Sequence, residues 1–146
     1  MSLPERNTLP HDVPWWVEEG AAFFITINAK ERGQNVLCKS DIALHLFESV
    51  EFRIEQFQWD MLLFLLMPDH LHMIARFNSE PGLRRVLADW KRYTARQFGV
   101  AWQRDFFDHR LRNDNEIEHK AEYIQMNPVR AGLVEDPEDW PYVWMW

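Results

Sequence analysis

The sequence has little cysteine, no long apolar run and no internal repeat. Cys38 is its single cysteine, so no disulfide can form within the chain, and a reducing compartment is the simple interpretation. The longest apolar runs, 21–25 and 61–67, fall well short of the roughly 18 to 20 residues that a membrane helix needs. The first residues include Pro4 and Glu5 rather than a basic stretch followed by an apolar one. We therefore expect a soluble, cytoplasmic protein.

Positive charge is also scarce: 16 Lys and Arg stand against 23 Asp and Glu, which gives a net charge of −7. A net negative charge argues weakly against nucleic acid as a binding partner. Residues 84–112 are the exception, because they hold eight Lys or Arg against three Asp, a net charge of +5. A basic segment between acidic ones fits a short track for phosphates, and it equally fits a solvated helix face.

Length and periodicity predict one domain over residues 1–146, since 146 residues that are 47% hydrophobic can bury a sizeable core. Strand-like patterns cover 22–29, 59–66, 70–77 and 103–112, and helical patterns cover 40–56, 81–99 and a third stretch that Asn113 or Asp114 caps and Pro128 ends. The lead-in and the tail after Gly132 look irregular. This order predicts an α+β, ferredoxin-like split βαβ fold, with an antiparallel sheet, helices on one face and an extra C-terminal helix.

The segment from Met67 to Ile74 carries two histidines two positions apart in a strand-like run. Successive strand side chains point to opposite faces, so His70 and His72 project from one face, while Leu71 between them points into the core. Two imidazoles side by side on a rigid strand are a common way to hold a divalent metal. A polar pair on an exposed sheet face has the same spacing, and both interpretations stay open.

Further ligands for such a metal are suggested by two other residues. Asn127 offers an amide oxygen if the third helix lies across the sheet, and two imidazoles with oxygen ligands suit Mg²⁺ or Mn²⁺ better than a closed zinc site. Asp69 either orients a histidine or only forms the turn before the strand, and we favour the turn.

Tyr123 stands four positions before Asn127, turned about 100° from Ile124 on a helix, so its hydroxyl lies at the edge of the core. A phenol is a weak nucleophile at neutral pH and needs an activated electrophile, which a metal-bound phosphodiester supplies. A boundary tyrosine that only packs is the alternative. His109 either binds phosphate, carries protons or caps the end of the fourth strand.

Three blocks of sequence, taken together, resemble the single-tyrosine HUH transposases, and within them the REP-associated tyrosine transposases. The segment 67–72 (Met-Pro-Asp-His-Leu-His) is similar to the HUH motif, and 102–110 is similar to the Trp-Gln-Arg and Asp-His elements of the group. The segment 122–134 is similar to the tyrosine helix and the Asn-Pro-Val turn that follows it. The resemblance runs from Trp15 to Pro141. Asp69 stands where the family usually has Asn.

The resemblance implies a metal-dependent endonuclease and strand transferase acting on single-stranded DNA. His70 and His72 would bind the divalent metal with help from Asn127. Tyr123 would attack a phosphodiester, leaving a 5′-phosphotyrosine and a free 3′-hydroxyl, so that rejoining needs no nucleotide cofactor. The family's targets are imperfect palindromes that fold into hairpins, and its members include monomers and homodimers.

The clustering of positive charge gives our own candidates for DNA contacts. In the helix predicted over 81–99, the apolar residues form one stripe and the arginines lie on another face. The candidates are Arg84, Arg85, Arg92, Arg96, Arg104 and His109. Two other functions stay open. One is a catalytically silent DNA-binding regulator on the same fold, and the other is a ferredoxin-like RNA-binding module whose aromatic side chains stack bases.

Overall fold

The computed structural model describes residues 21–146, so the expected irregular lead-in with Trp15 and Trp16 lies outside the described residues. The strands are β1 (Ala22–Asn28), β2 (Trp59–Met67), β3 (His70–Phe77), β4 (Phe107–Leu111) and β5 (Val143–Met145). The helices are α2 (Ser40–Glu55), α3 (Leu83–Phe98), α4 (Asp114–Gln125) and the short α5 (Asn127–Arg130), followed by a 3₁₀ turn, η1 (Pro137–Asp139). Within residues 21–146, none of the helices has the length and apolar character that crossing a membrane requires.

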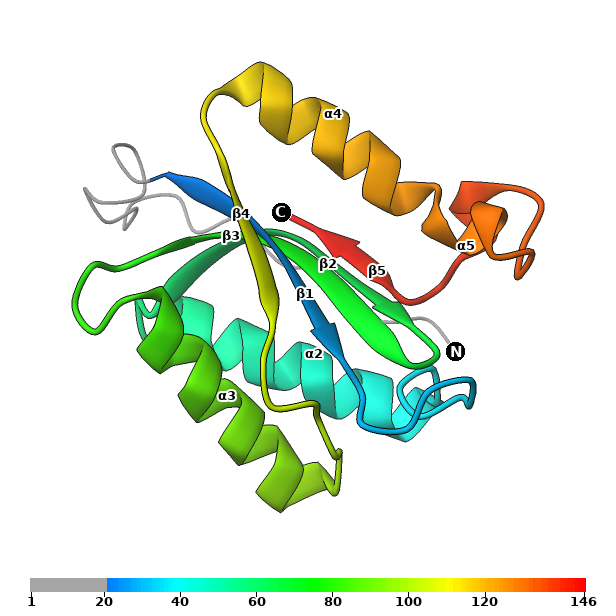
Figure 1. The fold of residues 1–146 in the computed structure, drawn as a ribbon, viewed down its shortest axis with the longest axis horizontal. Helices are drawn as coiled ribbons and strands as arrows, with labels where there is room; N and C mark the ends of the chain where they lie inside the picture. The colour runs from blue at the N-terminus through cyan, green and yellow to red at the C-terminus, as the bar shows by residue number, and fades with distance from the viewer. Residues whose placement is uncertain (1–20) are drawn as a thin grey trace.

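The strands form one antiparallel sheet in the order β4-β1-β3-β2-β5. Its first four members have the order that a split βαβ fold produces, which confirms the predicted fold class. Figure 1 shows α2 and α3 on one face of the sheet and α4 on the other. The extra helix therefore covers the face that the βαβ units leave open.

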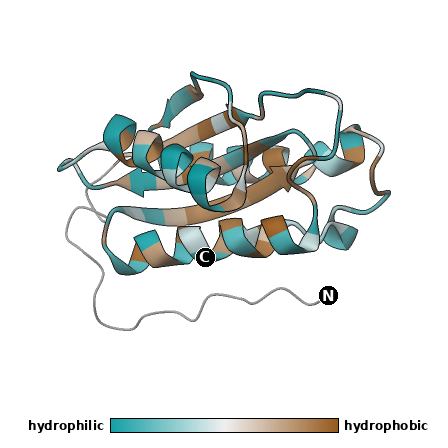
Figure 2. Ribbon diagram, turned by 90° about the horizontal axis from the view of Figure 1, so that it is seen from below, coloured by the Kyte–Doolittle hydropathy of each residue, from teal (hydrophilic) through white to brown (hydrophobic). Residues whose placement is uncertain are grey.

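The main core lies between the sheet and the pair α2 and α3. Leu46 and Val50 of α2 and Trp90 of α3 are fully buried against Phe64 and Met73 of the sheet. The indole N–H of Trp90 donates to the hydroxyl of Ser49 at 2.9 Å, which satisfies the polar atom of a fully buried ring. In Figure 2 brown, hydrophobic segments follow the strands, and the helices alternate between brown and teal along their length.

A second, smaller core lies beneath α4. Ile124 is fully buried there against Leu65 and Ile74 of the sheet, and Ile117 and Ala121 pack beside it. These three α4 residues are the apolar stripe that the sequence predicts. Because this stripe docks on the sheet, α4 lies across the same face from which the two histidines of β3 project.

Two element boundaries differ from the prediction at their first residues. Ser40 is the first residue of α2 rather than its cap, and Lys39 occupies the cap position. The helix predicted from Pro81 begins at Leu83, whereas its end at Gly99, with φ of +73°, is confirmed. Such offsets of one or two residues are usual at helix ends, where local and tertiary preferences compete.

Larger differences occur at the sheet edges. The strand predicted over 103–112 begins only at Phe107. Before it, the chain pairs with the end of β1 only at the Ala29–Trp102 bridge and the bond from the Gln103 N–H to Asn28, while the carbonyls of Gln103 and Arg104 accept hydrogen bonds from the Lys91 ammonium. The tail after Gly132 is not irregular throughout, since it holds η1 and β5. Three residues of β5 carry no periodicity of their own, and only their pairing with distant β2 makes them a strand.

Candidate active site

The register of the sheet gathers polar side chains on the face that α4 covers in part. Thr26 of β1 pairs with His72 on one side and with Phe107 on the other. His70 lies opposite Asn28. The rings of His70 and His72 stand 4.9 Å apart between centroids, as the alternation of the strand predicts. Leu71, between them, is fully buried in the core on the opposite face.

His70 is held by the preceding residue. Its Nδ1 lies 2.7 Å from Oδ1 of Asp69. The other carboxylate oxygen accepts the backbone N–H of Gly33 at 2.8 Å and lies 3.3 Å from Nε of Arg32. Gly33 has φ of +80°, a conformation that a side chain would strain. Asp69 therefore orients His70 in addition to forming the turn. From the sequence we favoured the turn alone.

The charge of Asp69 follows from these contacts. Partial burial by itself raises the pKa of this carboxyl, whereas the Gly33 N–H, His70 and the Arg32 guanidinium lower it by more, so the net direction is downward. The group is an anion at neutral pH, and an anion beside Nδ1 favours the proton on that nitrogen. The lone pair of His70 is then on Nε2, facing away from Asp69.

His72 is oriented in the same way by a neutral partner. Its Nδ1 lies 2.9 Å from the hydroxyl of Thr26, and its ring stacks on Phe24 with centroids 5.5 Å apart. Burial lowers the pKa of His72 to about 3, with smaller contributions from the charges of His70, Arg130 and Lys120. The ring is neutral at physiological pH, which is the form of histidine that coordinates metals.

These contacts test whether the pair fits a divalent metal. Both Nδ1 atoms are engaged, and neither Nε2 has a hydrogen-bond partner among residues 21–146. His70 has its lone pair on Nε2, and His72 has one there when its Nδ1 donates to the Thr26 hydroxyl. No group of three or more His, Cys, Asp or Glu able to hold a metal occurs in the described part of the chain. Any further protein ligand must be of another type, and the amide of Asn127 is of the type that Mg²⁺ and Mn²⁺ accept.

Tyr123 projects from α4 with 55% of its surface exposed. The guanidinium carbon of Arg130 lies 4.0 Å from the centroid of its ring, and Nζ of Lys120 lies 5.2 Å from it. Lys120 also lies 4.8 Å from the ring of Phe24, on which His72 stacks. The phenol therefore stands between two cations, one of which reaches back to the histidine pair.

One pocket brings together Tyr123, His72, Asn127 and His109 from the predicted site residues. Its volume is about 530 Å³, and it is lined by Phe24, Thr26, His72, Phe107, His109, Lys120, Tyr123 and Asn127. His70 is outside this lining but contacts His72 edge to face. His109 lies within β4, paired with Phe24, rather than at the end of the strand. The fold thus collects residues from β1, β3, β4, α4 and α5 around one hollow.

The helix that carries Tyr123 does not continue to Asn127 as the sequence suggests. It ends at Gln125, and Asn127 opens α5, in which Pro128 is buried. Proline has no N–H for an intrahelical bond and suits the first turn of a helix, so it starts α5 rather than simply halting α4. Tyr123 and Asn127, on either side of this break, still line the same pocket.

Arg130 is a site residue that sequence reasoning missed. Its guanidinium donates to the carbonyl of Tyr123 at 2.7 Å and to Oδ1 of Asn127, and it covers the Tyr123 ring. An amide oxygen has two lone pairs, so this bond leaves Asn127 one for a ligand. The only signal in the sequence is the position of Arg130 inside the Asn-Pro-Val-Arg segment.

The predicted arginine contacts lie elsewhere. Arg84, Arg85, Arg92 and Arg96 belong to α3, which packs on the face of the sheet opposite to α4 (Figure 1). Arg85 and Arg92 both pair with Asp89, at 3.5 and 3.4 Å. Arg104 lines a separate pocket beside α3. The arginines of α3 and the tyrosine pocket are therefore on different faces of the sheet, and the DNA contacts expected of these arginines, of Arg104 and of His109 stay predictions.

Comparison with known proteins gives consistent relatives, although no family model matches the chain. The chain is 26% identical to the "Putative REP-associated tyrosine transposase" of Haemophilus influenzae, over 85% of this chain and 79% of that protein. It is 27% identical to the REP-associated tyrosine transposase of Escherichia coli, over 85% of this chain and 76% of that protein. A solved structure of a REP-associated tyrosine transposase bound to a REP hairpin aligns with a TM-score of 0.74 and 22% identity, over 98% of this chain and 82% of that one. This last likeness confirms the fold.

Proposed function

We propose that this chain, which is similar to the REP-associated tyrosine transposases, is a member of that family and cleaves and rejoins single-stranded DNA at hairpin-forming sequences through Tyr123. One observation carries this proposal: Tyr123, His72 and Asn127, which come from separate elements of the fold, line one pocket. A phenol beside the neutral imidazole of His72 and two cations has the groups that a phosphodiester transfer needs. We place Tyr123 in the same copy of the chain as His72 and Asn127, since the three residues line one pocket.

The metal of this proposal is Mg²⁺ or Mn²⁺, which His70, His72 and the amide oxygen of Asn127 would hold. When bound, such an ion polarises a phosphoryl oxygen and makes the phosphorus a better electrophile. The hydrogen bonds of His70 with Asp69 and of His72 with Thr26 support this assignment, because they orient both rings in advance.

The protein residues would carry out the transfer as follows. Lys120 and Arg130 flank the Tyr123 ring and attract the DNA phosphate to it. The Tyr123 oxygen forms a bond to phosphorus as the bond from phosphorus to the 3′-oxygen breaks. The phenolic proton leaves to His109 or to solvent, and the departing 3′-oxygen takes up a proton. The phosphotyrosine keeps the energy of the linkage, and a second 3′-hydroxyl reverses the step on another strand.

The experiment that tests this function uses a DNA hairpin with single-stranded flanks, labelled on the flank that carries the new 5′ end. With Mn²⁺ or Mg²⁺ we expect a protein–DNA adduct that survives denaturing electrophoresis, and with EDTA we expect none. Tight hairpin binding without an adduct in either ion would instead favour the silent regulator. An adduct that forms equally well in EDTA would contradict the role of the metal.

Asp69 gives a prediction about the metal site. We expect Asp69→Ala to weaken Mn²⁺ binding by about 10- to 100-fold, because His70 loses the partner that orients its ring. Asp69→Asn should retain most of the affinity, since its amide oxygen can still accept from Nδ1. Calorimetric titration of Mn²⁺ measures both variants, with the exposed Glu48→Ala on α2 as the control. Equal affinity of Asp69→Ala and the parent protein would show that the contact does not tune the site.

A further inference from the structure

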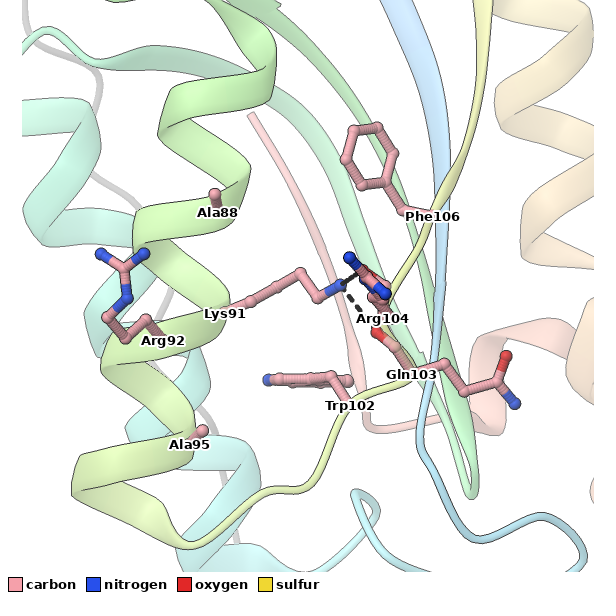
Figure 3. A pocket seen from close by; sticks show the side chains of 8 residues that line it. All are labelled: Ala88, Lys91, Arg92, Ala95, Trp102, Gln103, Arg104 and Phe106. Atoms are coloured by element: carbon pink, nitrogen blue, oxygen red, sulfur yellow. Dashed lines mark hydrogen bonds between the residues drawn. The ribbon is translucent and has the colours of Figure 1, made fainter.

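A second pocket lies beside α3, on the face of the sheet away from Tyr123. Its volume is about 340 Å³, and it separates α3 from the segment that leads into β4. Figure 3 shows the small side chains of Ala88 and Ala95 on the α3 wall, with Trp102 and Phe106 on the opposite wall. Small residues seven positions apart on one helix face leave room between α3 and this segment.

The charged residues that line this pocket all have the same sign. Lys91, Arg92 and Arg104 line it and no acidic side chain does, in a chain whose net charge is −7. The Lys91 ammonium donates to the carbonyls of Gln103 and Arg104 at 2.7 and 2.9 Å, so it is held across the hollow, as Figure 3 shows. Arg104 is exposed and has no ion-pair partner among residues 21–146. The pocket therefore suits an anion.

The two aromatic rings are held in place yet remain partly open. The indole N–H of Trp102 donates to the hydroxyl of Thr94 at 2.9 Å, and its ring packs 5.6 Å from that of Trp90. Phe106 is half-buried, with the Arg84 guanidinium 5.9 Å from its centroid. Fixed rings beside cations are the combination that binds single-stranded nucleic acid, in which bases stack on the rings and phosphates meet the cations.

The edge of the sheet connects this pocket to the tyrosine pocket. Phe106 lines the α3 pocket, and its neighbour Phe107, which is 58% exposed, lines the pocket of Tyr123 and His72. Adjacent side chains of an extended segment point to opposite faces, and β4 is the outermost strand. A single-stranded DNA that passes around the edge of the sheet at β4 would therefore contact both pockets, which are separated by the width of one β-strand.

We propose that the α3 pocket binds an unpaired nucleotide of the same single-stranded DNA, with its base on Phe106 and its phosphates on Arg92 and Arg104. This rests on the proposed function for the choice of DNA as the ligand. Arg92 and Arg104 then have a specific role, because they hold the DNA on one side of β4 while the phosphodiester to be cut lies on the other.

The test measures binding alone, so that it does not depend on cleavage. The protein carries Tyr123→Phe and is kept in EDTA, and fluorescence anisotropy follows its binding to fluorescein-labelled (dT)12 over a range of salt. We expect Arg92→Gln/Arg104→Gln to weaken binding about tenfold and to reduce the salt slope by about 1.4, the value for two lost phosphate contacts on a single strand. Phe106→Leu keeps the apolar volume but removes the ring face, and should weaken binding about fivefold with an unchanged slope.

Matched controls separate the pocket from general charge. Lys39→Gln/Arg112→Gln removes the same charge from exposed positions outside both pockets and should leave the affinity for (dT)12 near that of the parent. Circular dichroism melting confirms that each variant is folded. Parent-like binding by both pocket variants, an equal loss in the charge control, or a preference for (rU)12 over (dT)12 would each overturn the assignment. Failure of the adduct assay would affect the proposed function and leave this result standing.

Discussion

Replacing Tyr123 by phenylalanine is expected to abolish the covalent protein–DNA adduct, with a loss of at least about 10³-fold in the rate of strand cleavage. The substitution removes one oxygen, the only atom of the protein that bonds to phosphorus in the proposed reaction. The phenyl ring can still lie between Lys120 and Arg130, because those contacts are made to the ring face. We therefore expect the affinity for hairpin DNA and the melting temperature to stay close to those of the parent protein.

A second tyrosine supplies the control for this experiment. Tyr93 is 41% exposed and projects from α3, on the other face of the sheet. Tyr93→Phe makes the same chemical change outside the pocket and should cleave at the parental rate. If Tyr123→Phe still forms an adduct, another residue is the nucleophile, and mass spectrometry of the adduct would identify it.

Replacing either histidine of β3 by alanine is expected to reduce metal-dependent cleavage by at least about 10³-fold. Each change removes one of the two imidazole ligands proposed for the ion, and Asn127 alone cannot replace it. For His72→Ala, the cleavage rate should stay far below that of the parent protein even at high Mn²⁺ concentration, as a titration of rate against Mn²⁺ will measure. The exposed His119→Ala on α4 removes a histidine outside the pocket and is the control.

The structure changes what these two variants are expected to do to stability. The sequence suggests that both side chains are exposed, whereas both are half-buried, and His72 also stacks on Phe24 and bonds Thr26. His72→Ala should therefore lower the free energy of unfolding by about 1 to 2 kcal/mol, besides removing a proposed metal ligand. His70→Ala loses mainly its bond to Asp69 and should cost less. Parental cleavage by either folded variant would exclude that histidine as a ligand.

Periodicity was sufficient to predict the two features on which the site is built. The side-chain period of a strand is two, so the faces of His70 and His72 followed once β3 was identified. The period of a helix likewise gave the stripe of Ile117, Ala121 and Ile124, and with it the position of Tyr123 at the edge of the core. These are local consequences of backbone geometry, and tertiary contacts did not alter them.

Other parts of the site depended on residues that are distant in sequence. The role of Asp69 requires Gly33, whose N–H reaches it from the loop after β1. The placement of Arg130 requires the break after Gln125, which a proline permits but does not specify. The strand β5 exists because β2 offers it an edge. No local pattern carries such information.

By itself the sequence determined which residues share a face, because the periods of strand and helix are properties of the chain alone. Only the tertiary structure decided which faces meet: α4 docked on the open side of the sheet and brought Tyr123 to His72, while α3 kept its arginines on the other side. The physical reason is that docking depends on burying apolar stripes against one another. The charged and polar residues that do the chemistry are carried to wherever that burial places them.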